Sequence, residues 1–368
     1  MHILMTANSA WNIINFRRPV VRALLHQGHT VTVLAPSDDS VSEIKQFGCK
    51  FIPLIMNVKG LNPIDDLMLL RTFKNVLHSE KPDVVLSYTI KNNIFGAMAA
   101  TSFRIPFIPN VTGLGTAFLS GGMLQSLAER LYRHAFARLP AVFFQNEDDR
   151  DLFLRRGLIR NNQARILPGS GINLSYFSPA NFPTSDAPPV FLMIARILRD
   201  KGVVEFVEAA RAVKRTHPEA VFQLLGAMDA ENRSAISPAT VRQWEEEGDI
   251  YYLGTTKDVR SAIAAAHCIV LPSYREGAPR TLIEAAAMAR PIIATDVPGC
   301  RSVVNDHKTG FLCQPRNSVS LAHVCIQFLE LTHDAKLAMG IAGRAKMECE
   351  FDEGIIVEAY LEAVANVT

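Results

Sequence analysis

The segment CIVLPSYREGAPRTLIEAAAMARPIIATD (268–296) reads as a strand, a loop, a helix and a second strand. Both of its ends are short apolar runs rich in β-branched residues, which is typical of buried strands, and its middle has the alanine-rich composition of a helix. A helix that joins two strands in this way brings the second strand into the sheet parallel to the first. The segment therefore predicts a parallel sheet covered by helices.

Similar apolar runs alternate with helical stretches along most of the chain. The runs that we predict to be strands are HILMTA (2–7), TVTVLAP (30–36), KFIPL (50–54), VVLSYT (84–89), PFIPNV (106–111), AVFFQN (141–146), RILPG (165–169), VFLMIAR (190–196), VFQLLGA (221–227), IYYLG (250–254), CIVLPS (268–273), PIIATD (291–296) and GFLC (310–313). Continuous apolar strands occur in parallel sheets that helices cover on both faces. We therefore predict an α/β fold with two Rossmann-like, doubly wound parallel-sheet domains.

A stretch rich in proline and serine, SPANFPTSDAPP (178–189), separates the two series of strands and is typical of a linker. We expect an N-terminal domain over 1–177 and a C-terminal domain over 178–353. The amphipathic helix at 354–368 can pack on either domain, and we expect it to complete the N-terminal one. Ligands of such sheets bind at the carboxyl ends of the strands, so the expected site is the cleft between two facing domains.

The composition is that of an ordinary globular protein. Of the 368 residues, 48% are hydrophobic and 20% are charged, with a net charge of +2, which argues against a disordered chain and a nucleic-acid partner. No apolar run approaches the roughly 20 residues of a membrane-spanning helix, and the N-terminus lacks the pattern of a signal peptide. Six cysteines without a C-x-x-C pair favour reduced thiols. We expect a cytoplasmic protein.

Two glutamates of the opening segment, Glu276 in the loop and Glu284 about one turn inside the helix, lie eight positions apart and can face the same cleft. A carboxylate accepts two hydroxyl hydrogen bonds at once, as vicinal sugar hydroxyls require. The unsatisfied backbone amides at the start of the helix favour a phosphate. This arrangement suits a diphosphate with a sugar on each side. The alternative is that both carboxylates only complement the helix dipole, and the spacing alone does not decide between the two.

Two cations, Arg196 and Lys201, lie in ARILRDKG (195–202), at the end of a predicted strand and in the loop that follows. They can neutralise the charge of a departing nucleotide diphosphate. A unit-charge pair at about 4 Å is worth on the order of 4 kcal/mol at an effective dielectric constant of about 20, so two such groups can substitute for a metal ion. The alternative is a solvated basic loop.

Together these segments resemble glycosyltransferase family 4, the retaining transferases of the GT-B fold. The resemblance covers most of the chain, and its most specific parts are ARILRDKG (195–202), SYREGAPRTLIEAAAMARPIIATDVPG (273–299), TGFLCQP (309–315) and LPGSGIN (167–173). It implies that Glu276 contacts the donor sugar, while Arg196 and Lys201 hold the diphosphate; these three form the predicted catalytic set. It implies a donor-binding set of Glu284, which contacts the ribose, with Gly277, Ala278, Pro279, Arg280 and Thr281.

The N-terminal half resembles, more narrowly, transferases that extend a sugar on undecaprenyl diphosphate in the synthesis of O-antigen, capsule or N-glycan precursors. The matching segments are ANSAWNIINFRRPVVRAL (7–24), SYTIKNNIFGAMAA (87–100) and NVTGLGTAF (110–118). The acceptor-side residues predicted from it are Asn8, Trp11, Asn15, Lys91, Thr112 and Gly113. The chain departs from the family where a Gly-Gly turn often follows the first strand, because Asn8-Ser9 stands there, and where Arg301 follows VPGC in place of a glutamate.

We therefore expect a retaining glycosyltransferase that moves a sugar from a nucleotide diphosphate-sugar, UDP-HexNAc or UDP-hexose, to a polyprenyl-diphosphate-linked saccharide. We expect it to need no metal or other cofactor. Its expected place is peripheral, on the anionic inner face of the cell membrane. The alternatives are a sugar-nucleotide 2-epimerase of the same fold, a transferase with a soluble acceptor, and a sugar-nucleotide binder without activity.

Two further patterns have an ordinary structural interpretation. Asp149 and Asp151 match the D-x-D pattern of metal-dependent glycosyltransferases, but they lie where acidic residues open a helix. The helix predicted at MLQSLAERLYRHAFARLP (123–140) has Leu124, Leu127, Ala128, Leu131 and Ala135 on one face, with Arg130, Arg133, His134 and Arg138 elsewhere. It is either a domain helix with its apolar face in the core or a basic amphipathic surface held against anionic lipid.

Overall fold

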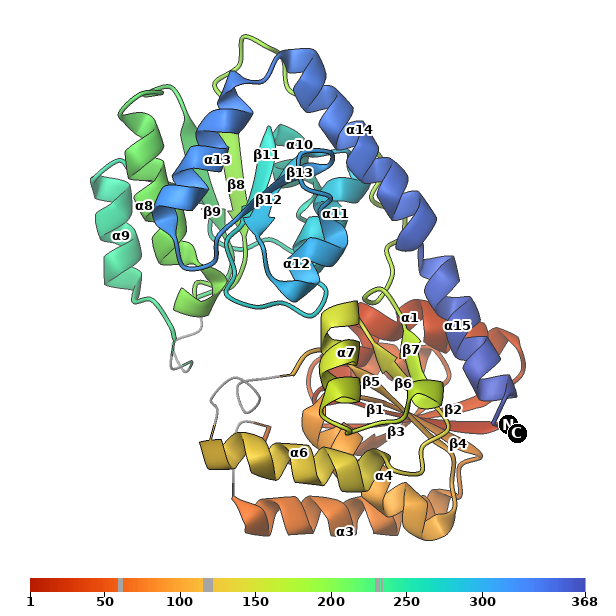
Figure 1. The fold of residues 1–368 in the computed structure, drawn as a ribbon. Helices are drawn as coiled ribbons and strands as arrows, with labels where there is room; N and C mark the ends of the chain where they lie inside the picture. Colours follow the sequence, from red (N-terminus) through yellow and green to blue (C-terminus); the bar gives the residue numbers. More distant parts are fainter. Residues whose placement is uncertain (59–61, 115–121, 229–231, 233, 368) are drawn as a thin grey trace. The chain divides into compact units, whose positions relative to one another are not determined.

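The computed structural model describes residues 1–58, 62–114, 122–228, 232 and 234–367. The chain forms two compact units. The first consists of Met1–Gly171 together with Glu353–Thr368, and the second is the continuous segment Ile172–Asp352. Each unit is built on one parallel sheet (Figure 1).

The sheet of the first unit has seven strands in the order β3-β2-β1-β4-β5-β6-β7. The strands are β1 (His2–Thr6), β2 (Thr30–Ala35), β3 (Lys50–Pro53), β4 (Val84–Tyr88), β5 (Phe107–Val111), β6 (Val142–Phe144) and β7 (Ala164–Ile166). The strand order reverses between β1 and β4, which pair with each other in parallel. Such a reversal is the place where ligands bind in doubly wound sheets, at the carboxyl ends of the strands.

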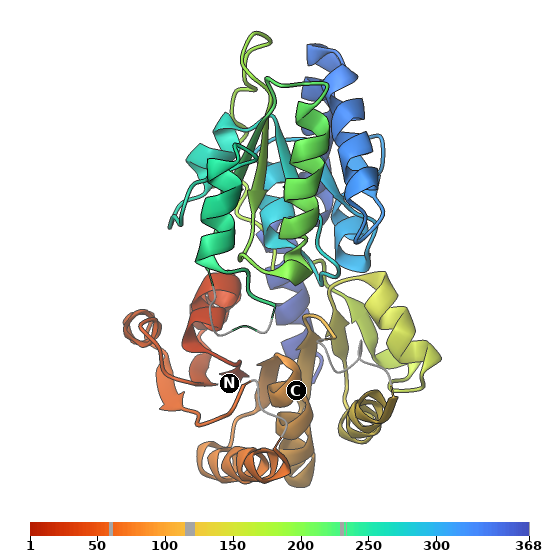
Figure 2. The ribbon, with the colours of Figure 1, turned by 90° about the vertical axis from the view of Figure 1, so that its left-hand side faces the viewer.

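Helices cover both faces of this sheet. They are α1 (Ala10–His26), α2 (Val41–Gln46), α3 (Pro63–Glu80), α4 (Ile90–Phe103), α6 (Gly122–Phe136), α7 (Glu147–Arg155) and α15 (Glu353–Ala365), with a 3-10 turn η1 (Asn161–Gln163). Side chains alternate along β1, so that Ile3 and Met5 join one core and Leu4 joins the other. Helix α1 packs against α15 and α2 over the first core, while α4 packs between α3 and α6 over the second (Figures 1 and 2).

The sheet of the second unit has six parallel strands in the order β10-β9-β8-β11-β12-β13. The strands are β8 (Val190–Ile194), β9 (Val221–Leu225), β10 (Tyr251–Tyr252), β11 (Cys268–Leu271), β12 (Ile292–Thr295) and β13 (Gly310–Cys313). The helices are η2 (Arg199–Lys201), α8 (Val203–Lys214), α9 (Pro238–Glu246), α10 (Arg260–Ala265), α11 (Arg280–Ala287), α12 (Pro298–Val303), α13 (Ser318–Glu330) and α14 (His333–Glu350). The strand order reverses between β8 and β11.

The α/β class and the two doubly wound parallel sheets are confirmed, and every segment predicted as a strand overlaps one. The stretch 178–189, predicted as a linker, lies within the second unit. Its backbone is held there by Arg290, whose guanidinium donates to the carbonyl oxygens of Ala180 and Asn181. The last helix, α15, belongs to the first unit, where Ile356 and Tyr360 are buried in the core beneath α1. Among the residues that the structure describes, every helix is too short or too polar to cross a bilayer.

Candidate active site

The loop that follows β8 is pressed against the end of β11. Gly202 has the left-handed backbone conformation (φ 76°), and a Cβ atom there would lie 2.1 Å from the carbonyl oxygen of Pro272, so only glycine fits. The backbone N–H of Tyr274 donates to the carbonyl of Asp200 at 2.9 Å. These contacts bring Lys201, at the end of η2, beside the loop that carries Glu276.

Lys201 and Glu276 form an ion pair, with 2.5 Å between Nζ and Oε1. Their side chains are 24% and 13% exposed, so the pair is partly buried yet open to solvent. The backbone of Glu276 is also fixed, because its carbonyl accepts from the N–H of Gly299 at 3.2 Å. Gly299 is the second residue of α12, and a Cβ atom on it would lie 2.5 Å from the carbonyl oxygen of Gly277. The loops after β8, β11 and β12 thus meet at Glu276, the first at its carboxylate and the last at its backbone.

The first turn of α11 lies at the same edge of the sheet. Pro279 is extended and precedes the helix, and its carbonyl accepts from the N–H groups of Leu282 and Ile283 at 3.0 and 3.2 Å. The hydroxyl of Thr281 donates to the carbonyl of Ile194, the last residue of β8, at 3.2 Å. Gly277 and Ala278 complete the loop before the helix, and Arg280 is its first residue. The predicted donor-binding residues therefore follow β11 directly, beside the end of β8.

Glu284 is paired within α11. Nε of Arg280, one turn earlier, donates to its Oε1 at 2.7 Å, and the carboxylate side chain is only 13% exposed. Burial raises the pKa of Glu284 above its ordinary value, although Arg280 opposes the shift, and the negative charge of Asp258 adds to it. An ionised carboxylate in this position can accept two hydrogen bonds from a diol, whereas protonation turns one of its oxygens into a donor and leaves less acceptor capacity.

Arg196 lies two residues beyond β8, and its side chain is exposed. The backbone around it is fixed, because the N–H of Ala195 donates to the carbonyl of Leu225 at 3.0 Å, and the carbonyl of Arg196 accepts from Leu198 at 2.8 Å. The predicted catalytic residues thus divide into two groups. Lys201 and Glu276 form one group, because their side chains are in contact. Arg196 forms the other: it lies on the same loop as Lys201, but its side chain is exposed.

Sequence reasoning missed a second polar cluster in this unit. The hydroxyl of Tyr274, next to the predicted loop residues, donates to Oε1 of Glu205 at 2.7 Å. The guanidinium of Arg316 lies over the Tyr274 ring, 4.5 Å from its centroid. Burial and the neighbouring Glu205 raise the pKa of Tyr274 to about 12. Arg316 directly follows the segment TGFLCQP (309–315), and this position in the sequence could have marked it as a site residue. No feature of the sequence indicated a role for Glu205.

The predicted acceptor-side residues lie at the carboxyl edge of the first sheet or near it. Asn8 and Trp11 follow β1, Asn15 lies farther along α1, and Lys91 follows β4. Thr112 and Gly113 come directly after β5, while positions 115–118 of the matching segment lie outside the described residues. The Trp11 side chain is 53% exposed. Lys91 is held by an ion pair of 2.7 Å with Asp66 of α3.

The turn between β4 and α4 is strained and tied to β1. Thr89 has φ 73°, which is uncommon for a β-branched residue, and its hydroxyl donates to Oδ1 of Asn92 at 2.9 Å. Asn92 is fully buried and donates to the hydroxyl of Thr6 at 2.8 Å and to the carbonyl of Ala7 at 3.1 Å. Strain of this kind clusters at functional sites, and sequence reasoning did not foresee it.

The D-x-D pattern lies at the start of α7, which follows β6 and not the strands β1 and β4 where the order of the first sheet reverses. Asp149 is buried and accepts from the side chain of Asn146 at 3.1 Å, and Asp151 pairs with Arg150 at 2.8 Å. Within the described residues, no group of three or more histidine, cysteine, aspartate or glutamate side chains is placed to hold a metal ion.

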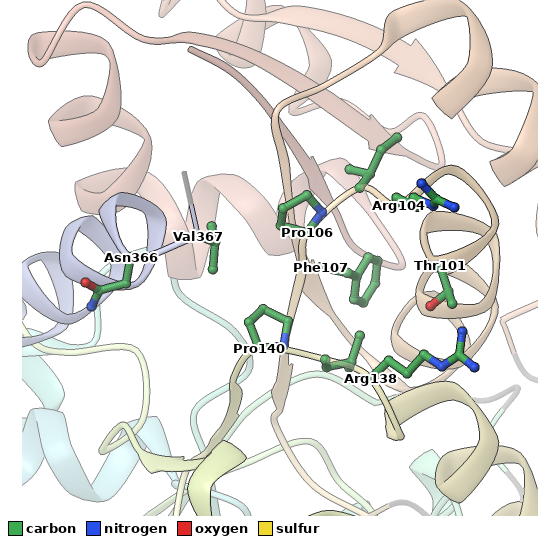
Figure 3. Close-up of a pocket in the computed structure, with 10 residues that line it drawn as sticks. Thr101, Arg104, Pro106, Phe107, Arg138, Pro140, Asn366 and Val367 are labelled. Atoms are coloured by element: carbon green, nitrogen blue, oxygen red, sulfur yellow. The ribbon is translucent and has the colours of Figure 1, made fainter.

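A cavity of about 350 Å³ lies at the opposite, amino edge of the first sheet (Figure 3). Its lining includes Pro106 and Phe107 at the start of β5, the exposed side chains of Arg104 and Arg138, and Val367. None of the predicted site residues lines it.

Comparison with known proteins gives consistent matches in both units. Residues 177–346 match the family described as glycosyl transferases group 1, and residues 15–169 match the glycosyl transferase 4-like domain. The chain is 30% identical to N,N'-diacetylbacillosaminyl-diphospho-undecaprenol alpha-1,3-N-acetylgalactosaminyltransferase of Campylobacter jejuni, over 100% of this chain and 99% of that protein. It is 24% identical to UDP-Gal:alpha-D-GlcNAc-diphosphoundecaprenol alpha-1,3-galactosyltransferase of Escherichia coli, over 75% of this chain and 72% of that protein.

Solved structures share the fold at lower identity. Sucrose-phosphate synthase from Thermosynechococcus elongatus aligns with a TM-score of 0.81 at 19% identity, over 100% of this chain and 99% of that one. HepE from Anabaena, solved in complex with UDP, aligns with a TM-score of 0.79 at 17% identity, over 100% of both chains.

Proposed function

Because the chain belongs to the family 4 glycosyltransferases, enzymes of the GT-B fold, we propose that it moves a sugar from a nucleotide diphosphate-sugar to a lipid-linked saccharide with retention of configuration. The observation that carries this proposal is the meeting of Lys201, Glu276 and the first turn of α11 at the strand-order reversal of the second sheet. A cation, a carboxylate and a helix start at one edge match the charge and hydroxyls of a sugar diphosphate.

We propose a UDP-hexose or a UDP-HexNAc as the donor. The E. coli relative is named for UDP-Gal, the C. jejuni relative for N-acetylgalactosaminyl transfer, and the Anabaena structure holds UDP. In this assignment Glu284 accepts hydrogen bonds from the ribose diol, and Glu276 contacts the transferred sugar. Lys201 must then serve both Glu276 and the diphosphate, because the ammonium already contacts that carboxylate.

The reaction we propose is a front-face displacement at the anomeric carbon. The bond from that carbon to the β-phosphate oxygen breaks while the acceptor oxygen bonds to the same carbon, and the departing phosphate takes the acceptor's proton. Negative charge grows on the diphosphate, and the cations Arg196 and Lys201, which lie on one loop with a hydrogen-bonded backbone, stabilise it. Orientation of the two substrates supplies the rest of the acceleration. We propose that these cations, and not a metal ion, carry out this role.

The proposed acceptor is a saccharide on a polyprenyl diphosphate. The support is that both relatives described above are named for undecaprenyl-diphosphate-linked acceptors, one of them over the full length of the chain. The predicted acceptor-side residues lie in the first unit, with Asn8, Trp11 and Lys91 flanking the reversal between β1 and β4.

A peripheral place at an anionic membrane forms part of this proposal. The starts of α3 and α6, which follow the carboxyl edge of the sheet, leave apolar side chains exposed: Leu67 and Leu127 are 54% exposed and Met123 is 90% exposed. Ala128 and Leu131 of α6 pack on the core, so only the beginning of the predicted apolar face is available to lipid. Arg133 donates to the carbonyls of Arg156 and Gly157, directly after α7, and is structural.

The test is an assay with acceptor omission. The protein is incubated with each UDP-sugar of a panel, with and without a short-chain polyprenyl-diphosphate saccharide, and released UDP and sugars are measured. The proposal predicts that UDP release depends on the acceptor. Release of UDP and a free epimerised sugar without acceptor would identify an epimerase. Equal transfer to the free saccharide would identify a transferase with a soluble acceptor. Donor binding without turnover would indicate a binding protein without activity.

A further inference from the structure

Among the residues that the structure describes, two arginines are almost completely buried, and their hydrogen-bonding groups are satisfied very differently. Arg290 in the second unit is 0% exposed, and its guanidinium donates to backbone carbonyls of Ile263, Ala180, Met288, Asn181 and Ala264. Arg17, in the middle of α1 in the first unit, is 2% exposed. Within the described parts of the chain, neither Nε nor Nη1 of Arg17 has a hydrogen-bond partner. Arg290 is therefore a structural arginine, whereas two buried nitrogen atoms of Arg17 donate no hydrogen bond to any described residue.

The surroundings of Arg17 belong to the carboxyl edge of the first sheet. Its guanidinium lies over the ring of Tyr88, 4.4 Å from the centroid, and Tyr88 is the last residue of β4. Asn110 is the register partner of Tyr88 on β5, and its Nδ2 donates to the hydroxyl of Tyr360 at 2.9 Å. Oδ1 of Asn110 is buried and has no partner among the described residues. Unused polar atoms thus gather where β4 and β5 end.

A buried guanidinium without a hydrogen-bonded anion is an unfavourable arrangement. The face of the Tyr88 ring attracts the cation, but it uses none of the N–H groups. The groups that satisfy a guanidinium best are the oxygens of phosphates and carboxylates, which accept short, charge-assisted hydrogen bonds. The neighbouring Arg18 shows the contrast: its side chain is 41% exposed and pairs with Glu43 at 2.6 Å.

We propose that Arg17 is an oxyanion-binding residue of the first unit, which takes an oxygen of the acceptor, either from its diphosphate or from the carboxylate of an acidic sugar. The assignment of this oxygen to the acceptor rests on the function proposed above. The assignment of Arg17 as an oxyanion site depends only on its buried guanidinium, whose Nε and Nη1 have no hydrogen-bond partner in the part of the chain that the structure describes. The ring of Tyr88 holds the guanidinium plane, and Asn110 lies beside it. The residue then acts in recognition of the acceptor and not in the chemistry at the donor.

The experiment measures thermal unfolding of the full-length protein with saturating UDP, so that the donor site is occupied. Inorganic pyrophosphate and glucuronate are titrated in separate arms against the parent, Arg17→Met, Arg18→Met and Arg138→Met. Arg18→Met controls for loss of a helix arginine, and Arg138→Met tests whether the anion binds in the cavity at the opposite edge (Figure 3). An anion at about 100 times its dissociation constant is expected to raise the midpoint of a unit of this size by roughly 5–10 °C.

The proposal predicts that one of the two anions stabilises the parent, Arg18→Met and Arg138→Met, and that Arg17→Met loses the response. Which anion does so identifies the source of the oxyanion. Without anions, Arg17→Met should unfold at the same temperature as the parent or higher, since an unpaired buried charge is replaced by an apolar side chain of similar length. Loss of stability in Arg17→Met together with an unchanged anion response, or no response to either anion in the parent, would overturn the proposal.

If Arg17→Met does not fold, Arg17→Lys provides the test, because lysine keeps the positive charge but lacks the planar guanidinium group. Its affinity for the anion should fall at least tenfold while UDP affinity is unchanged. In a transfer assay the same variant should raise KM for the lipid-linked acceptor and leave KM for the donor unaffected. Anion binding through Arg17 without any transfer activity in the parent would contradict the proposed function and support the site.

Discussion

Lys201 and Glu276 offer the sharpest perturbation of the proposed active site, because they touch each other and are assigned to different parts of the donor. We consider Lys201→Met, Glu276→Gln and the double variant, with the exposed Lys308→Met as a control for loss of a lysine in the same unit. The pair has 2.5 Å between Nζ and Oε1, with side chains 24% and 13% exposed. It therefore falls between exposed pairs, worth about 0.2–1 kcal/mol, and buried ones, whose disruption costs about 3–5 kcal/mol.

From this burial we expect Lys201→Met to lower the free energy of unfolding by about 1–3 kcal/mol, because it leaves Glu276 without its partner. Glu276→Gln and the double variant should each lose less, since neither leaves an unpaired carboxylate. In thermal unfolding, each kcal/mol corresponds to roughly 2–4 °C for a unit of this size. The difference between the stability change of the double variant and the sum of the two single changes measures the ion pair itself, independently of activity.

The catalytic effect separates two roles of Lys201. If the ammonium stabilises the leaving diphosphate, Lys201→Met should lower kcat roughly 10²–10³-fold with little change in donor affinity. The double variant should then be far slower than Glu276→Gln alone. If Lys201 only orients Glu276, the double variant should match Glu276→Gln. Single-turnover transfer assays with calorimetric donor binding measure both quantities. Turnover of Lys201→Met within threefold of the parent would refute the diphosphate assignment.

Three further predictions follow from the same assignments. Glu284→Gln should weaken donor binding. The same variant should have a higher free energy of unfolding than the parent at pH 7, because burial raises the pKa of Glu284 and ionisation therefore costs stability. This difference should shrink as the pH falls and vanish well below pH 4, where Glu284 is protonated in the folded and the unfolded protein alike. Activity should survive exhaustive chelation with EDTA, and loss of activity that Mn²⁺ or Mg²⁺ restores would return attention to Asp149. Replacing the exposed Arg130 of α6 by glutamine should weaken binding to anionic vesicles at low salt, since each arginine near such a surface contributes about 1 kcal/mol, while leaving UDP binding unchanged. Equal vesicle binding by variant and parent would remove this residue from the membrane proposal.

The strands were predictable because buried parallel strands are nearly continuous apolar runs, and the turns between them carry glycine, proline or polar residues. Segment 268–296 shows this well: β11 and β12 lie where the apolar runs are, and Pro279 precedes α11. Composition misled at 178–189, where proline and serine suggest a linker. That segment is anchored to the second unit by Arg290, more than 100 positions away, and no local pattern reports such a contact.

The sequence was enough to name candidate residues and the loops that carry them, but not the contacts that these residues make with one another. Lys201 and Glu276 are 75 positions apart, and their contact depends on how the loops after β8 and β11 meet at Gly202. Arg17 illustrates a different limit. In the sequence it stands beside Arg18 and reads as part of a basic helix surface, but the two side chains point to opposite environments because 17 falls on the buried stripe of α1.

The anomeric configuration of the product tests the central claim most directly. The protein is incubated with the UDP-sugar that it consumes and a short-chain polyprenyl-diphosphate saccharide, and the purified product is analysed by mass spectrometry and by the anomeric proton coupling in NMR. The account predicts one added sugar per UDP released, attached with the same anomeric configuration that it had in the donor. An added sugar of the opposite configuration, or UDP release that leaves the lipid-linked saccharide unextended, would contradict it.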